Sequence, residues 1–169
     1  WLRAWLLDKV WLRAPGLAGQ PLPAALEGLC DGLRRRSRTT VACYVVGDAA
    51  RLPPAVNDVL WRVAQEALTN IEKHAQARAV ELTLEIAPHE VMLSVCDDGV
   101  GLAHSQSEGQ ESSAPGTRLG LLGMAERVES VGGQLQVTDR PSGGVCVRAE
   151  IPMPGVTRCA PVANDSSLP

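Results

Sequence analysis

The chain has 169 residues, which fits one domain, and its 45% apolar content is enough to build a hydrophobic core. Its formal net charge of −3, with Lys and Arg spread along the chain, lacks the basic stripe that a nucleic-acid groove requires, so we expect no nucleic-acid partner. The 5 cysteines include no Cys-x-x-Cys pair, which indicates neither a zinc site nor a disulfide framework and favours buried thiols in a reducing compartment.

No apolar run is long enough to span a membrane, and the start of the chain lacks the pattern of a signal peptide. We therefore expect a cytoplasmic fragment without direct membrane contact, which can belong to a larger, membrane-anchored protein. Residues 1–14 are apolar, include three tryptophans and begin without an N-cap, so they predict the C-terminal end of a helix from a longer chain.

The first domain helix is predicted over residues 22–33, where apolar residues recur at helical spacing. The arginines that follow, at 34–36 and 38, suit a solvated helix C-terminus. Residues 39–46 are β-branched and apolar and end at Gly47-Asp48, which predicts a strand and a turn. A long helix then begins at Pro53-Pro54 and should end near residues 75–77.

Two alternating runs, 80–86 and 91–96, predict a β-hairpin. Polar residues 103–118 show no periodicity and predict a mobile lid loop. A helix is then predicted over residues 119–131. Strands are predicted at 134–139 and 144–151, and a disordered tail at 154–169. Because the strand pairs are local, this order favours an α+β two-layer sandwich, with three helices on one face of a mixed, mostly antiparallel sheet.

Polar residues on the long helix form the first candidate cluster. Glu66, Asn70 and His74 are four residues apart, and Lys73 lies one step aside. This stripe overlaps the flank of the predicted apolar face, so we expect its polar groups to face inward. Burying them costs several kcal/mol unless they are paired, which suggests a polar ligand. The alternative is a helix with internal Glu/Lys pairing and a satisfied core histidine.

A second cluster follows the predicted strand 91–96. Asp97 comes directly after that strand, and Gly99 and Gly101 allow the backbone to pass close to a flat ligand. A carboxylate at this place accepts a hydrogen bond from an exocyclic amine, which favours adenine over guanine. The alternative is a simple Asp-Gly turn.

Glycines at 116, 120 and 123 surround the predicted start of the next helix. Backbone N–H groups and the positive end of the helix dipole make such a helix start an anion site. A Walker loop is excluded because no Gly-Lys-Ser/Thr follows. The alternative is a helix entry that glycine merely makes permissive.

The three clusters together resemble the nucleotide boxes of the GHKL (Bergerat-fold) ATPase superfamily. Segments 65–70 and 123–128 are most similar to sensor histidine kinases of the NarX and DesK groups, which act on NarL-type response regulators. The resemblance covers roughly residues 17–152. It implies an ATP-binding catalytic domain at 15–153, preceded at 1–14 by the end of a dimerisation helix, in a full-length homodimer.

The resemblance also implies roles for individual residues. It implies that Asn70 binds Mg²⁺, that Glu66 is the acidic catalytic residue near the reacting phosphate, and that Asp97 holds the adenine amine. It assigns phosphate contacts to Lys73 and His74, which makes both of them catalytic residues. The remaining nucleotide contacts that it implies are Gly99, Gly101, Gly116, Thr117, Leu119, Gly120 and Leu121. Arg118 stands where the family commonly has a second glycine.

The implied reaction transfers the γ-phosphoryl group of Mg-ATP to a histidine on upstream dimerisation helices. None of the histidines at 74, 89 and 104 opens a long amphipathic helix, so we expect the phosphoacceptor to lie outside this chain. Alternative functions are a serine/threonine kinase of the anti-sigma type, an ATPase of the gyrase, Hsp90 or mismatch-repair kind, and a degenerate domain that serves as a protein-binding module.

Overall fold

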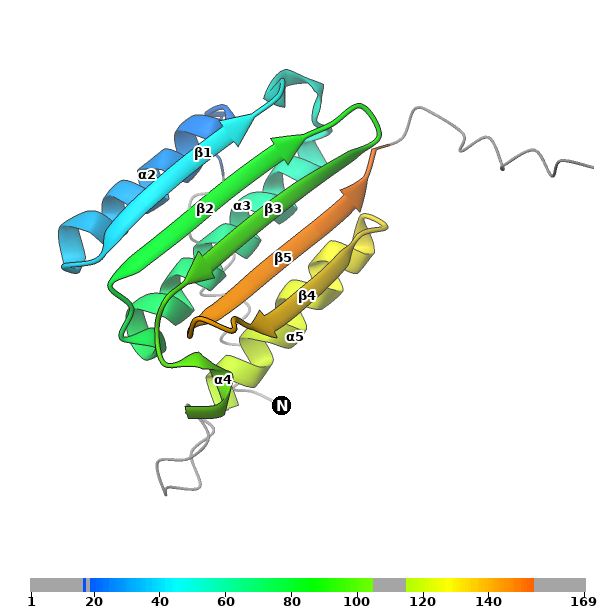
Figure 1. The fold of residues 1–169 in the computed structure, drawn as a ribbon. Coiled ribbons are helices and arrows are strands. Elements are labelled where there is room, and N and C mark those ends of the chain that lie inside the picture. Colours follow the sequence, from blue (N-terminus) through cyan, green and yellow to red (C-terminus); the bar gives the residue numbers. More distant parts are fainter. Residues whose placement is uncertain (1–16, 18, 105–114, 154–169) are drawn as a thin grey trace, which may run out of the picture.

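The computed structural model describes residues 17, 19–104 and 115–153, in which helices cover one face of a sheet (Figure 1). The predictions for residues 1–14 and 154–169 lie outside these ranges. The strands are β1 (Thr40–Val46), β2 (Ala79–Ile86), β3 (Glu90–Asp97), β4 (Gln134–Asp139) and β5 (Val145–Pro152). The longer helices are α2 (Leu22–Arg36), α3 (Pro54–Asn70) and α5 (Pro115–Ser130). None of the helices within the described ranges is long and apolar enough to cross a membrane.

The sheet has the strand order β1-β2-β3-β5-β4 in the described part of the chain. Strands β1 and β2 are parallel, and the other neighbours are antiparallel. A parallel pair needs a crossover, and helix α3 supplies it, preceded by the short helix η1 (Ala49–Arg51). The α+β two-layer sandwich with a mixed sheet is therefore confirmed.

The core lies between the helices and one face of the sheet. Along β2 and β3 buried residues alternate with more exposed ones, because successive side chains of a strand point to opposite faces. Helices α2, α3 and α5 contribute Leu26, Leu60 and Met124, which are fully buried. They pack over Leu82 and Leu93 of the sheet, so apolar burial holds the two layers together.

The arginines at the end of α2 are tied to neighbouring elements. Arg34 donates from Nε and Nη2 to the carbonyl oxygen of Val41, at 3.0 and 2.8 Å. Arg36 donates from Nε and Nη2 to the two carboxylate oxygens of Glu72, both at 2.9 Å. The predicted solvated helix end is thus correct in charge, but two of its arginines also join α2 to β1 and to the end of the long helix.

The predicted lid loop over residues 103–118 is wrong at both ends. A short helix, α4 (Gly101–His104), includes the first two of these residues, and α5 begins at Pro115 instead of residue 119. Proline suits the first turn of a helix because its missing N–H would have no intrahelical partner there. Residues 105–114 of the predicted lid lie outside the described ranges.

The prediction that the cysteines form no disulfide is also wrong. Cys96 of β3 and Cys146 of β5 are bonded across the sheet, with their Cα atoms 4.1 Å apart. The antiparallel register places the two residues directly opposite each other, a pairing that their separation of 50 residues conceals in the sequence. Within the described residues Cys30 and Cys43 are free thiols.

Candidate functional site

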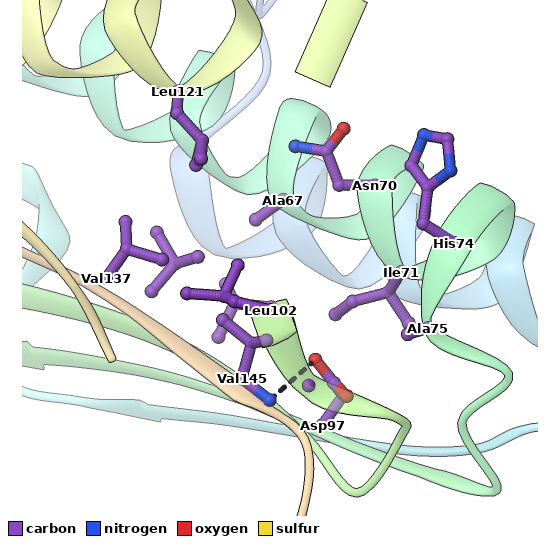
Figure 2. Close-up of a pocket in the computed structure, with 13 residues that line it drawn as sticks. Ala67, Asn70, Ile71, His74, Ala75, Asp97, Leu102, Leu121, Val137 and Val145 are labelled. Atoms are coloured by element: carbon purple, nitrogen blue, oxygen red, sulfur yellow. Dashed lines mark hydrogen bonds between the residues drawn. The ribbon is translucent and has the colours of Figure 1, made fainter. Parts of the chain in front are cut away.

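A cavity opens between the C-terminal half of the long helix and one end of the sheet (Figure 2). The end of β3 and the β4–β5 hairpin form its floor, and α3 and α5 form its sides. The described residues that line it are Ala67, Asn70, Ile71, His74, Ala75, Val95, Asp97, Gly101, Leu102, Leu121, Val137, Val145 and Val147. Most of these side chains are apolar, as in sites that hold a flat aromatic ring.

Asp97 lies on the floor of this cavity. It is 2% exposed and is the only charged side chain classed as buried within the described ranges. Its Oδ1 accepts a hydrogen bond from the N–H of Gly99 at 2.8 Å. Its Oδ2 accepts one from the N–H of Val145 at 3.3 Å, the bond that Figure 2 marks. These two bonds orient the carboxylate and leave it further lone pairs for a ligand that donates hydrogen bonds.

Burial raises the pKa of Asp97, because the charged form loses hydration. The N–H groups of Gly99 and Val145 oppose this rise in the pKa, and so does the guanidinium of Arg140. The neighbouring Asp98 adds to the rise. A buried carboxylate with a raised pKa inside an apolar cavity is typical of a ligand-binding group.

The loop that follows Asp97 passes close to the end of the long helix. The N–H of Val100 donates to the carbonyl oxygen of Ala75 at 2.9 Å. A Cβ added at Gly99 would overlap that same carbonyl oxygen, and Gly101 has a φ of 80°, which side chains rarely permit. The prediction that these glycines let the backbone pass close to a flat ligand stays a prediction; in the structure, glycine at position 99 lets the loop approach the protein's own backbone at Ala75.

The turn that receives this loop was not predicted. After Asn70 the long helix continues as a π-helical turn, η2 (Ile71–Ala75), which ends at Gln76 with a left-handed φ of 51°. Such turns are rare and occur often at functional sites. Here the turn carries His74 and Ala75 to the cavity lining, and no periodicity in the sequence distinguishes it from an ordinary helix end.

The polar stripe of the long helix reaches the cavity only in part. The structure brings Asn70 and His74 together with Asp97 in the cavity lining (Figure 2). Glu66 is half-buried and lies outside the described lining, whereas Lys73 is exposed and also lies outside it. The expectation that the stripe faces inward is therefore wrong for Lys73, and His74 is also exposed although it lines the cavity.

The glycine-rich segment enters the site through α5. Gly116, Thr117 and Leu119 lie in the first turns of this helix, and Leu121 lines the cavity. Gly120 lies directly against the long helix, since a Cβ added there would overlap Oε1 of Glu66. The glycine-rich segment of α5 and the polar stripe of α3 thus contact each other at Gly120.

Sequence reasoning predicted the strands β4 and β5 but missed that they form an apolar wall of the cavity. Val137 and Val147 come from β4 and β5, and Leu102 comes from α4. Alternation along the two strands indicates which residues share a face. It does not indicate that this hairpin lies beside β3, so the sequence offered no signal that these valines meet Asp97.

The fold is that of the catalytic domains of histidine kinases. A kinase domain of the blue-light activated histidine kinase from Erythrobacter litoralis EL346 superposes with a TM-score of 0.58 at 25% identity, over 78% of this chain and 61% of that one. The catalytic domain of the histidine kinase ThkA superposes with a TM-score of 0.59 at 20% identity, over 78% and 91% of the two chains, and this likeness concerns the fold alone.

Residues 55–155 match the family model described as "Histidine kinase-, DNA gyrase B-, and HSP90-like ATPase". The chain belongs to this family of ATPase domains, which the GHKL resemblance predicted.

Among curated relatives, the oxygen sensor histidine kinase NreB of Staphylococcus carnosus (strain TM300) is 31% identical over 144 residues, covering 85% of this chain and 40% of the relative. The histidine-protein kinase/phosphatase DegS of Brevibacillus brevis is 35% identical over 108 residues, covering 64% and 26%. The chain thus spans less than half the length of these relatives.

Proposed function

We propose that this chain is the ATP-binding catalytic domain, at residues 15–153, of a sensor histidine kinase. The observation that carries the proposal is the buried carboxylate of Asp97 on the floor of an apolar cavity, with Asn70 and His74 in the same lining. An apolar slot of this kind takes the adenine ring, and the carboxylate accepts a hydrogen bond from its exocyclic amine. The family to which the chain belongs supports ATP as the ligand.

The polar groups at the helix side of the cavity are assigned to the phosphates. Asn70 and His74 project from the same side of the long helix and its π-helical turn (Figure 2). Lys73, being exposed, is free to turn its ammonium toward a triphosphate. Glu66 lies between α3 and α5 and is the acidic residue that we assign to the proton of the attacking group.

The first turns of α5, which contain Gly116, Thr117 and Leu119, present backbone N–H groups to an anion. We therefore assign this helix start to the phosphates as well, and Gly120 and Leu121 to the wall that follows it. Gly99 and Gly101 complete the set by keeping the loop after Asp97 close to the floor.

Magnesium fits this donor set. Mg²⁺ keeps several waters and takes one or two protein oxygens together with phosphate oxygens, and the amide of Asn70 offers one such oxygen in the cavity lining. No cluster of three or more His, Cys, Asp or Glu that would hold a metal by itself occurs among the described residues. The ion, when bound with ATP, neutralises charge on the phosphates during transfer.

The group that receives the phosphoryl is proposed to be a histidine on upstream dimerisation helices of the same protein, of which residues 1–14 are the end. The full-length protein is proposed to be a cytoplasmic or membrane-anchored homodimer that passes the phosphoryl group to a NarL-type response regulator. The similarity to histidine kinases such as NreB and DegS supports this assignment.

Titration of Mg-ATP into the purified chain by calorimetry tests the proposal. We expect saturable binding that Asp97→Asn and Asn70→Ala each weaken by about tenfold or more. Asp97→Asn removes the charged acceptor of the adenine amine, and Asn70→Ala removes an oxygen ligand of Mg²⁺. Absence of saturable binding, or binding that neither substitution changes, would identify a degenerate domain. Supplying the upstream helices and detecting acid-labile phosphate then distinguishes transfer to histidine from transfer to serine.

A further inference from the structure

The turn between β4 and β5 reaches across to the loop that carries Asp97, and two of its side chains bind that loop. Asp139 and Arg140 are neighbours at the end of β4, in a part of the chain that neither the three nucleotide boxes nor the cavity lining includes. Their contacts fall at the two ends of the segment from Asp97 to Leu102.

Arg140 holds the beginning of the segment. Its Nη1 donates to the carbonyl oxygen of Asp97 at 2.9 Å, a charge-assisted hydrogen bond. The backbone of Arg140 is itself fixed, because its N–H donates to the Gly144 carbonyl at 2.9 Å and its carbonyl accepts from the N–H of Gly143 at 3.0 Å. The guanidinium therefore projects from a turn whose backbone is held by two hydrogen bonds.

Asp139 holds the end of the segment. Its Oδ1 accepts a hydrogen bond from the N–H of Leu102 at 2.7 Å, at the start of α4. The Asp139 side chain lies so close to the loop that a Cβ added at Gly101 would be 3.0 Å from that same Oδ1. A Cβ added at Gly144 would overlap the carbonyl oxygen of Asp97. Glycine at both positions lets the turn and the loop meet.

We propose that Asp139 and Arg140 are positioning residues that hold the Asp97 carboxylate where it accepts the adenine amine, and so set the preference for adenine. The inference rests on the proposed ATP site. Asp97 is the last residue of β3; it pairs with Val80 of β2 but has no register partner in β5. The next residue, Asp98, is still bonded to Ala79 of β2, so the contacts from Asp139 and Arg140 hold the segment on the side of β5. A binding group keeps its selectivity only when its neighbours fix its position.

A general structural role predicts a different result from a positioning role. Both side chains are exposed, and surface contacts of this kind contribute little to global stability. Loss of positioning affects a ligand that uses the Asp97 carboxylate more than one that does not. Inosine triphosphate has a carbonyl oxygen where ATP has the exocyclic amine, so it lacks the donor that the carboxylate is placed to accept and depends less on the position of that carboxylate.

The test is to measure the affinities of the 169-residue chain for Mg-ATP and Mg-ITP by calorimetry, in Arg140→Ala, Arg140→Lys and Asp139→Ala. We expect Arg140→Ala and Asp139→Ala to lower the ATP-to-ITP affinity ratio about three- to tenfold, with a smaller change in ITP affinity. Arg140→Lys should restore part of the ratio because it keeps a charged donor. Arg148→Ala, which removes an exposed arginine of the same hairpin, is the matched control and should leave the ratio unchanged.

An unchanged ratio in both Arg140→Ala and Asp139→Ala, with wild-type discrimination intact, would overturn the positioning role alone. An equal loss of both nucleotides, together with a lower melting temperature, would also overturn it in favour of a structural role. If the unaltered chain binds neither nucleotide, the proposed ATP site fails and this inference fails with it. The wild-type titration therefore separates the two failures.

Discussion

Gly120 of α5 lies against the carboxylate of Glu66 on α3, so closely that a Cβ at position 120 would overlap Oε1 of that glutamate. The obstructing atom is the tip of a flexible side chain, not backbone. Alanine at this position therefore displaces the carboxylate without breaking the packing of the two helices.

We predict that Gly120→Ala keeps the fold and even raises the melting temperature, because alanine stabilises a helix interior by up to about 1 kcal/mol relative to glycine. Phosphoryl transfer to the proposed upstream histidine should fall by about tenfold or more, since the carboxylate that we assign to this step leaves its place. Gly123→Ala in the same helix is the control, because its Cβ would meet only the guanidinium end of Arg127, at 3.2 Å. Equal transfer rates in the two variants would contradict the role of Glu66.

The raised pKa of Asp97 predicts a pH dependence of nucleotide binding. Only the ionised carboxylate accepts the adenine amine fully, so ATP affinity should fall as pH decreases through a pKa that lies above the ordinary aspartate value. The contribution of Asp97 to stability has the opposite sign: it is fully present below the unfolded-state pKa and is lost as pH rises through the folded-state pKa. Calorimetric titrations of ATP across roughly pH 4 to 8 check the predicted fall in affinity. Asp97→Asn should lack the inflection.

The ion pair between Arg36 and Glu72 joins α2 to the π-helical turn. Its side chains are 59% and 30% exposed, so solvent screening limits its contribution, and Glu72→Gln should lower the free energy of unfolding by no more than about 1 kcal/mol. The hydrogen bond from Arg36 lowers the pKa of Glu72. The contribution is therefore present above the unfolded-state pKa and is lost as pH falls through the folded-state pKa.

Urea unfolding of Glu72→Gln and of the wild-type chain, at neutral pH and in acid, measures this contribution. The difference between the two proteins should vanish in acid. Glu129→Gln, a substitution of an exposed glutamate on α5, should show no such convergence. A constant difference at both pH values would contradict the assignment to the ion pair.

The disulfide between β3 and β5 predicts which cysteines react with a thiol reagent. In denaturant without reductant, iodoacetamide should modify Cys30 and Cys43 but leave Cys96 and Cys146 unmodified, as peptide mass spectrometry would detect. Modification of Cys96 before reduction would contradict the bond. Replacing both bonded cysteines by serine should lower stability by about 2–4 kcal/mol, because the crosslink restricts the unfolded chain.

The helices and strands were largely predictable because their signals are local. Alternation located β2 and β3, and apolar spacing located α2 and α3, each within a few residues of the observed bounds. The place of Asp97 at the end of a buried strand was predictable as well, although the same residues also suited a simple Asp-Gly turn. Lys73 was misplaced because helical spacing alone sets direction only to within about one residue.

Features that depend on distant pairings could not be predicted. The disulfide, the valine wall and the contacts of Asp139 and Arg140 all require β5 to lie beside β3. Neither hairpin indicates in its own sequence which strand of the other it will join. The π-helical turn is missing from the prediction for a different reason, because it differs from an α-helix by one hydrogen-bond step that side-chain patterns do not record.

The position of β5 between β3 and β4 also has a consequence for biosynthesis. The partners of Asp97 at Arg140 and Val145 lie 43 and 48 residues after it, so a ribosome must release the β4–β5 hairpin before the carboxylate can be oriented. Until then the edge of β3 that pairs with β5 is unpaired, and an unpaired edge is vulnerable to aggregation. A ligand that uses the oriented Asp97 carboxylate can therefore bind only after the β4–β5 hairpin has been synthesised.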